Sequence, residues 1–313
     1  MNTRAVLLRT FACVAALTLS AVANAQLPRA YLSSTGHDGG PCTLAHPCRM
    51  LPAALDAIVD GGEVWMLDSA DYNTASVTIA KSATIQAVPG AVASITSFGF
   101  LPAISINASG LTIALRNLQI VAFPGSLPNT AGIAMSGANT LIIENSLIAN
   151  QPSDGIYVFG PGKLRVTNSI FRKNSINAME LSNGVVAEIS GSQMVDNGST
   201  GVLARGGLSA IVTISDSVIS GGYDGIDTFT VSAGEVVRVT VTRCTIEGAS
   251  NAALEIQGVG DGSTILAVSG STIVNNNYPW KIAPGGTIRS LGNNHVTDNR
   301  SAPVGSLTPT APQ

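Results

Sequence analysis

The chain repeats one phrase, as in Asn145-Ser146-Leu147-Ile148, Asn168-Ser169-Ile170-Phe171 and Gly191-Ser192-Gln193-Met194. The second residues of all the copies are Leu118, Ser146, Ser169, Ser192, Ser217, Cys244 and Ser271. The steps between them are 28, 23, 23, 25, 27 and 27 residues. A near-constant period in this range is typical of stacked units that each bury an apolar core against their neighbours.

Each repeat contains three short runs with the character of β-strands. An alternating run such as Leu164-Arg165-Val166-Thr167 precedes the phrase, and period-two alternation indicates a half-buried strand. The phrase supplies a second strand, and a run such as Gly155-Ile156-Tyr157-Val158 supplies a third. Gly, Asn and Asp between the runs favour tight corners because they tolerate positive φ. These features predict a solenoid whose strands pair in parallel, one turn apart.

Stacked turns would place equivalent residues in columns. The inward column of the second strand is predicted to be Ile120, Ile148, Phe171, Met194, Ile219, Ile246 and Ile273. An interior stack of hydroxyls is predicted from serines 146, 169, 192, 217 and 271, with Cys244 as a small buried substitute. An amide ladder at one corner is predicted from Asn150, Asn174, Asn197 and Asn276.

The first 25 residues have the pattern of a cleaved signal peptide. Arg4 and Arg9 precede an apolar stretch from Phe11 to Val22, and Ala23-Asn24-Ala25 fits a cleavage site. No other segment approaches the ~20 apolar residues of a membrane helix. We therefore expect an exported, periplasmic or extracellular protein with no membrane span after processing; the alternative is an uncleaved anchor.

The composition argues against two classes of partner. Charged residues are 11% of the chain, and removal of residues 1–25 leaves 14 basic against 19 acidic side chains. Nucleic acids and anionic membranes need a basic surface, so neither is an expected partner. We expect the protein to be a monomer.

Cys42 and Cys48 flank a polar loop that contains proline. In an oxidising compartment this spacing favours a local disulfide. Such a short loop should contribute no more than the ~3 kcal/mol expected of a 15-residue loop. A metal site that combines these thiols with His37 or His46 is the alternative, although two cysteines at this spacing are a weak zinc signal.

The repeat as a whole, over residues 63–299, resembles the right-handed parallel β-helix proteins of the pectin-lyase-like superfamily. The segment 34–64 is similar to the N-terminal cap of secreted bacterial members, and Leu51, Leu55 and Ile58 lie on one helical stripe within it. We therefore predict an all-β, right-handed parallel β-helix with three strands per turn and a short N-terminal capping helix. The predicted organisation is a signal peptide (1–25), a cap with the disulfide loop and helix (26–62), the β-helix (63–299) and a disordered tail (300–313).

Two outward columns of the third strand differ from the Ser- and Thr-rich remainder of the predicted surface. The first is Ala134, Tyr157, Glu180, Leu203, Asp227 and Glu255; the second is Ser136, Phe159, Ser182, Arg205, Phe229 and Gln257. Aromatic rings suit the apolar side of a sugar, and charged groups suit its hydroxyls or carboxylates. The candidate ligand-binding residues are Tyr157, Phe159, Glu180, Arg205, Asp227, Phe229 and Glu255. The alternative is a set of ordinary solvated side chains.

The same face offers weak catalytic candidates in Glu180, Arg205, Asp227 and Glu255. Residues one turn apart lie roughly 5 Å apart and those two turns apart roughly 10 Å. Retaining glycosidases separate their carboxylates by ~5–5.5 Å and inverting ones by ~6.5–9.5 Å, so spacing alone does not discriminate.

The resemblance supplies further comparisons. Asp224-Gly225-Ile226-Asp227 is similar to the first part of the polygalacturonase pattern, but Asn251-Ala252 replaces its later pair of aspartates and its Gly-His-Gly is absent. Arg205 beside Glu180 and Asp227 is a faint match to the calcium-dependent pectate lyases. No cofactor or metal is predicted, and calcium remains open. We expect a protein that interacts with polysaccharide without catalysis. The alternatives are a polysaccharide lyase or glycoside hydrolase, and a structural or adhesive surface module.

Overall fold

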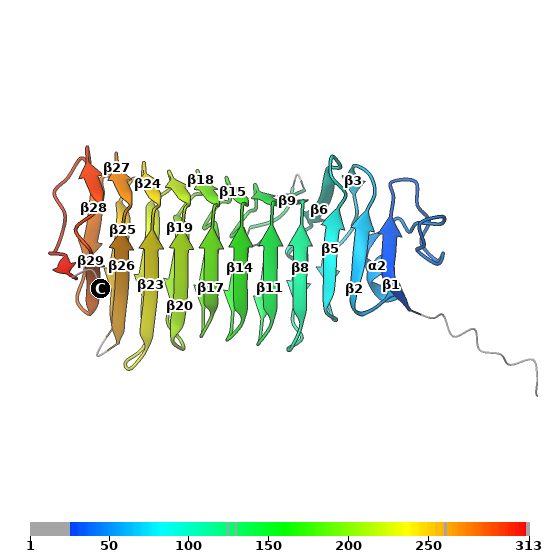
Figure 1. Cartoon of the computed structure of the whole chain (residues 1–313), viewed down its shortest axis with the longest axis horizontal. Helices are drawn as coiled ribbons and strands as arrows, with labels where there is room; N and C mark the ends of the chain where they lie inside the picture. The colour runs from blue at the N-terminus through cyan, green and yellow to red at the C-terminus, as the bar shows by residue number, and fades with distance from the viewer. Residues whose placement is uncertain (1–25, 124, 129, 260–261, 311–313) are drawn as a thin grey trace, which may run out of the picture.

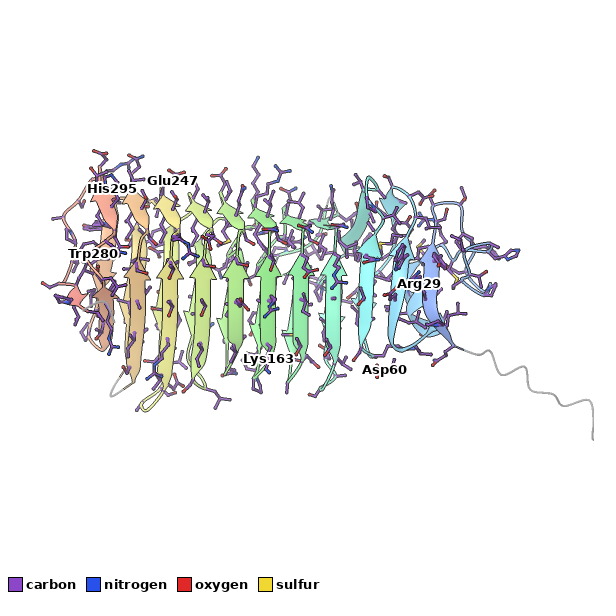
Figure 2. All side chains as sticks on the ribbon, viewed as in Figure 1. Arg29, Asp60, Lys163, Glu247, Trp280 and His295 are labelled. Atoms are coloured by element: carbon purple, nitrogen blue, oxygen red, sulfur yellow. A yellow bond between two sulfur atoms is a disulfide. The ribbon has the colours of Figure 1, made fainter. Side chains whose placement is uncertain are left out.

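The computed structural model describes residues 26–123, 125–128, 130–259 and 262–310. The chain forms a parallel β-helix whose turns stack along one long axis from the N-terminal to the C-terminal end (Figure 1). Side chains project along the whole length of this stack (Figure 2). The predicted all-β class and parallel β-helix are confirmed, whereas the predicted signal peptide lies outside the described residues.

Three parallel sheets form the walls of the solenoid, and each strand pairs with its counterpart in the next turn. The twelve-stranded sheet contains β1 (Leu27–Leu32), β2 (Ile58–Met66), β5 (Ala83–Ala87), β8 (Thr112–Arg116), β11 (Thr140–Glu144), β14 (Lys163–Thr167), β17 (Val186–Ser190), β20 (Ala210–Ser215), β23 (Val236–Thr242), β26 (Ser263–Ser269), β29 (Gly286–Ser290) and β31 (Thr308–Pro309). The ten-stranded sheet contains β3 (Ala70–Asp71), β6 (Ala93–Ser97), β9 (Leu118–Ala122), β12 (Leu147–Ala149), β15 (Ile170–Arg172), β18 (Gln193–Val195), β21 (Val218–Ser220), β24 (Thr245–Glu247), β27 (Thr272–Val274) and β30 (His295–Thr297). The nine-stranded sheet contains β4 (Val77–Thr78), β7 (Ile104–Ile106), β10 (Ile133–Ser136), β13 (Ile156–Phe159), β16 (Met179–Ser182), β19 (Thr200–Arg205), β22 (Asp224–Phe229), β25 (Ala252–Gln257) and β28 (Tyr278–Ile282).

The first residue of each phrase turns the corner from the twelve-stranded to the ten-stranded sheet. All seven of these residues have φ between 48° and 57°: Asn117, Asn145, Asn168, Gly191, Asp216, Arg243 and Gly270. Asn, Asp and Gly are the residues that adopt this left-handed conformation most readily. Arg243 is the exception, and its guanidinium makes two 2.7 Å contacts with the carboxylate of Asp216, the corner residue one turn earlier.

The interior columns follow the predicted register. Ile148 pairs with Ile120 on one side and with Phe171 on the other, and all three are fully buried. The serine stack is confirmed as well: the backbone N–H of Ser146 donates to Ser169 Oγ at 3.2 Å, and this hydroxyl donates to the carbonyl of Thr167. Cys244 takes the serine position in its turn and is buried.

The amide ladder differs from the prediction by one residue in its first turn. Asn174 Nδ2 donates to Asn197 Oδ1 at 2.9 Å, but the turn before contributes Gln151, whose backbone N–H donates to Asn174 Oδ1. Asn150 instead occupies the corner just before it, with φ of 59°. Asn is favoured at both positions, so the sequence alone did not separate them.

The N-terminal cap contributes to the solenoid itself. β1 pairs in parallel with β2, so the twelve-stranded sheet begins before residue 63, where the β-helix was expected to start. Helix α2 (Leu51–Ala57) covers the end of the core with Leu51 and Leu55, as the apolar stripe predicted, and is the only helix among the described residues. Within those residues no helix is long and apolar enough to cross a bilayer.

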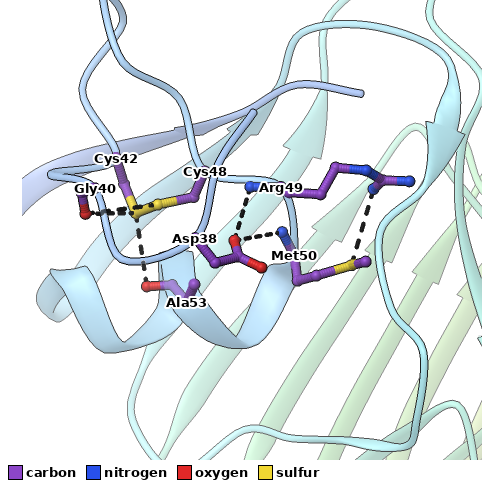
Figure 3. Close-up of a disulfide and its surroundings, with 7 residues drawn as sticks. All are labelled: Asp38, Gly40, Cys42, Cys48, Arg49, Met50 and Ala53. Atoms are coloured by element: carbon purple, nitrogen blue, oxygen red, sulfur yellow. Dashed lines mark hydrogen bonds between the residues drawn. A yellow bond between two sulfur atoms is a disulfide. The ribbon is translucent and has the colours of Figure 1, made fainter. Parts of the chain in front are cut away.

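A disulfide joins Cys42 and Cys48 beside this helix (Figure 3). Asp38 Oδ1 in the same loop accepts the backbone N–H groups of Arg49 and Met50 at 2.8 and 2.9 Å, which fixes the start of α2. Because both sulfur atoms are bonded to each other, the alternative metal site with His37 or His46 is not formed. The disulfide prediction is confirmed.

The C-terminal segment also differs from the expected disordered tail over its described part, residues 300–310. β31 pairs with β29, and Leu307 packs against the end of the core. The indole N–H of Trp280 donates to the carbonyl of Gly305 at 3.0 Å. The apolar end of the stack explains this contact, because an uncovered last turn would expose its core and its strand edge. Residues 311–313 lie outside the described range.

Asn197→Ala is expected to destabilise the protein by about 1–3 kcal/mol. Asn197 is buried, its Oδ1 accepts two N–H groups of Asn174, and its Nδ2 donates to the carbonyl of Phe171. Alanine would leave these buried groups without partners, and each such loss is costly. Urea unfolding of the variant measures the change. Asn107→Ala, at an exposed position, is the control, and an equal effect of both substitutions would contradict the role of the ladder.

Candidate functional site

The outward residues of the nine-stranded sheet form two continuous columns, which we call the nine-stranded face. The register aligns Ala134, Tyr157, Glu180, Leu203, Asp227, Glu255 and Lys281 in the first column. It aligns Ser136, Phe159, Ser182, Arg205, Phe229 and Gln257 in the second. The structure thus places all seven sequence-derived candidates on one face, and it extends the first column to Lys281 on β28.

One group on this face, the Arg205 cluster, comprises Tyr157, Phe159, Glu180, Arg205 and Phe229. Arg205 Nη1 lies 2.7 Å from Glu180 Oε1, and the guanidinium carbon lies 5.3 Å from the centre of the Phe229 ring. The Tyr157 and Phe159 rings are 6.2 Å apart with 28° between their planes. Because Glu180 is only 14% exposed, it holds the guanidinium in one orientation over the phenyl ring. The cluster presents flat, partly apolar surfaces bordered by hydrogen-bonding groups.

A second group, the Asp227 cluster, comprises Asp224, Asp227, Asn251, Glu255 and Lys281. Lys281 Nζ lies 3.5 Å from Glu255 Oε1 and donates to Asn251 Oδ1 at 3.2 Å. Asn251 Nδ2 in turn donates to Asp224 Oδ1 at 2.8 Å and to Glu255 Oε2. Asp224 also accepts the backbone N–H of Ala252, which anchors it at the start of β22. Asp227 is the next residue outward on this strand and adjoins Glu255 in the register.

Burial and mutual repulsion hold protons on the aspartates of this cluster. Desolvation, followed by the charges of Asp224 and Glu255, raises the pKa of Asp227 to about 7. Desolvation raises the pKa of Asp224 to about 6, with a smaller contribution from the charge of Glu255. On β13 side of the face, desolvation and the charge of Glu180 also raise the pKa of Asp154. A carboxyl group that titrates near neutral pH can donate or accept a proton under ordinary conditions.

The two clusters are neighbours but remain distinct. Leu203 separates Glu180 from Asp227 in the first column, so the catalytic candidates divide into an ion pair with Arg205 and an adjacent pair of carboxylates. Sequence reasoning missed Lys281 and the parts played by Asp224 and Asn251. Extending the column by one more turn would have found Lys281. The Asp224 and Asn251 side chains lie at strand starts, where alternation does not fix their direction.

The chemistry available to the nine-stranded face consists of hydrogen bonding, ring stacking and proton transfer. Among the described residues, no group of three or more His, Cys, Asp and Glu side chains has an arrangement that could hold a metal ion. Buried Cys244 lies away from this face and its pKa is raised, first by desolvation, so its thiol is poorly suited to act as a nucleophile.

Comparison with known families gives one match. The family model described as the right handed beta helix region matches residues 130–302, more than half of the chain. No curated protein matches the sequence.

Solved structures with the same fold share little sequence with this chain. A crystal structure of pectate lyase Pel9A is 13% identical, with 90% of this chain and 78% of that chain covered and a TM-score of 0.69. The complex of XylC with xylose is 9% identical, covers 86% and 70% of the two chains, and has a TM-score of 0.56. The periplasmic alginate epimerase AlgG is 10% identical, covers 76% and 60%, and has a TM-score of 0.52. At such identities the similarity establishes the fold alone.

Asp227→Asn is expected to stabilise the protein more at pH 8 than at pH 5. The folded protein keeps the Asp227 proton up to about pH 7, whereas an unfolded chain loses it near pH 4. The stability contributed by protonated Asp227 is therefore lost as the pH rises from about 4 through 7, and an uncharged amide avoids that loss. Urea unfolding at both pH values provides the measurement.

Asp216→Asn is the matched control for this prediction. The hydrogen bond from Arg243 lowers the pKa of Asp216, so removing its charge should weaken the protein slightly at pH 8. The same gain for Asp227→Asn at both pH values would show that ionisation is not the cause.

Proposed function

We propose that this chain, which belongs to the right-handed β-helix family, binds a polysaccharide along its nine-stranded face. The observation that carries the proposal is the Arg205 cluster, in which Glu180 fixes a guanidinium over Phe229 while two further rings lie nearby. Sugar rings present apolar sides to aromatic and guanidinium planes and hydroxyls to charged acceptors. A cluster whose side chains are already held in place loses little entropy on binding.

The dimensions of the face suit an extended polymer. Six strands from β13 to β28 contribute outward side chains, and adjacent strands lie ~4.8 Å apart, so this part of the face is roughly 24 Å long. Rings and the Arg205 pair lie toward β13, and hydrogen-bonding groups of the Asp227 cluster lie toward β28. Several sugar units could therefore contact the face together, and many weak contacts along one chain add to a useful affinity.

Three further considerations support the proposal. Pectate lyase Pel9A, XylC in complex with xylose, and the alginate epimerase AlgG share the fold, and their names connect those proteins with carbohydrate. The Cys42–Cys48 disulfide agrees with an oxidising compartment, as does the predicted signal peptide at 1–25. We accordingly place the protein outside the cytoplasm, where it would meet extracellular or envelope polysaccharide. A structural or adhesive surface module is the alternative if no glycan binds.

Glycan binding is expected to fall about tenfold, or ~1.4 kcal/mol, in Tyr157→Ala and in Phe229→Ala. A glycan array identifies the polymer, and titration calorimetry then measures the affinities. Trp65→Ala is the matched control, because Trp65 also stacks with an arginine, Arg29 at 4.3 Å, but on the twelve-stranded sheet. Loss of binding in all three variants, or in none, would contradict a site on the nine-stranded face.

A second candidate function is hydrolysis of the bound glycan, and the raised pKa of Asp227 beside Glu255 favours it. Asp227 would protonate the leaving oxygen, and Glu255 on the adjacent strand is near the ~5–5.5 Å separation of retaining glycosidases. A lyase has less support, because Arg205 and Lys281 are both paired with carboxylates and are not free to neutralise a uronate.

If the protein is a hydrolase, it should release reducing ends from the polymer that it binds. Asp227→Asn would then lower the rate about 10²- to 10⁴-fold, since it removes the acid. Asp216→Asn, on another face, should leave the rate unchanged. Binding without any release of reducing ends would restrict the function to binding.

A further inference from the structure

We propose that the polysaccharide recognised by the nine-stranded face is a neutral glycan and not a polyuronate. This inference rests on the proposed function and specifies the substrate class of the same site. It follows from the pairing of positive and negative groups along the face. It also sets this chain apart from the pectate and alginate named for two proteins of the same fold.

Both cations of the two clusters are already engaged. Arg205 is paired with Glu180 at 2.7 Å, and the ring of Phe229 lies against the guanidinium. Lys281 is held by Glu255 and by the amide oxygen of Asn251. A uronate carboxylate would have to break one of these pairs, and that exchange gains little because one anion merely replaces another.

The remaining charged groups would repel an acidic polymer. Asp224 and Asp227 on β22 lie beside Glu255 and have no cation of their own, since Lys281 contacts Glu255 and Asn251 instead. Their raised pKa values show that the surroundings already resist negative charge. Asp154 adds a further carboxyl group near Glu180. A polymer with one carboxylate per sugar would add charge where the existing anions are poorly screened.

The same groups suit hydroxyls. Glu180 and Glu255 accept hydrogen bonds, protonated Asp227 can both donate and accept, and Gln257 and Ser136 extend the polar edge of the face. The Tyr157, Phe159 and Phe229 rings are indifferent to charge and favour the apolar side of a sugar ring. A neutral hexose or pentose polymer therefore meets every feature of the face without an electrostatic cost.

The test compares neutral hexasaccharides (xylohexaose, cellohexaose, laminarihexaose and galactohexaose) with hexagalacturonate, by titration calorimetry of the full chain at neutral pH. At least one neutral ligand is expected to bind, with loss of affinity in Tyr157→Ala, and hexagalacturonate is expected not to bind. Glu180→Gln frees Arg205 from its partner and should increase hexagalacturonate affinity about 2- to 5-fold at the site. Glu188→Gln is the matched control, because it frees Arg165 from a 3.0 Å ion pair on the twelve-stranded sheet and should have no effect.

The possible outcomes separate this inference from the proposed function. Binding of hexagalacturonate that Tyr157→Ala abolishes would overturn the neutral assignment while the binding site stood. Selective binding of a cationic glucosamine hexamer that strengthens from pH 6 to 8, as Asp224 and Asp227 ionise beside Glu255 and Lys281, would overturn it in favour of an amino sugar. Absence of binding to every glycan on the array would overturn both proposals.

Discussion

Parallel hydrogen bonding between successive turns is the constraint on which the interior and the surface of this molecule both depend. Each strand must return to the same register after 23 to 28 residues, although the repeats differ in length. The left-handed corner that begins each phrase is kept in every turn. Extra residues enter elsewhere, as in the long connection from β9 to β10 and in the one from β22 to β23. Length variation is thus absorbed beside the nine-stranded sheet and does not disturb the columns.

The fixed register makes a polar interior possible. Serine hydroxyls and asparagine amides lie inside the solenoid, where each would be costly without a partner. Because the next turn always presents the same group, each finds its partner one turn away, as Ser146 does with Ser169 and Asn174 with Asn197. No buried side-chain nitrogen or oxygen among the described residues lacks a hydrogen bond. Only the two ends of the stack lack a neighbouring turn, and α2 and the segment around Leu307 cover them.

The same periodicity explains how much the sequence could predict. Strand types, inward residues and both outward columns follow from alternation and spacing, so the fold and the positions of Tyr157, Glu180 and Asp227 were predictable. The pairing of β1 was not, because it lies outside the repeat and its partner is set by the cap. The ladder shifted by one residue because Asn suits both the corner and the position after it. Side chains at strand starts, such as Asp224, were missed because alternation applies only within strands, and the pKa of Asp227 depends on packing that spacing does not express.

The distribution of charge separates the nine-stranded face from the structural needs of the solenoid. On the twelve-stranded sheet, carboxylates are matched with cations, as in Arg116–Glu144 and Arg165–Glu188, and such pairs neutralise themselves. Asp224 and Asp227 have no such match, and their raised pKa values mean that ionising them weakens the fold. Stacking does not require carboxylates here, because serine, alanine and leucine occupy equivalent positions in other turns of the same columns. Groups that the fold tolerates at a cost and does not need are best explained by a ligand outside it.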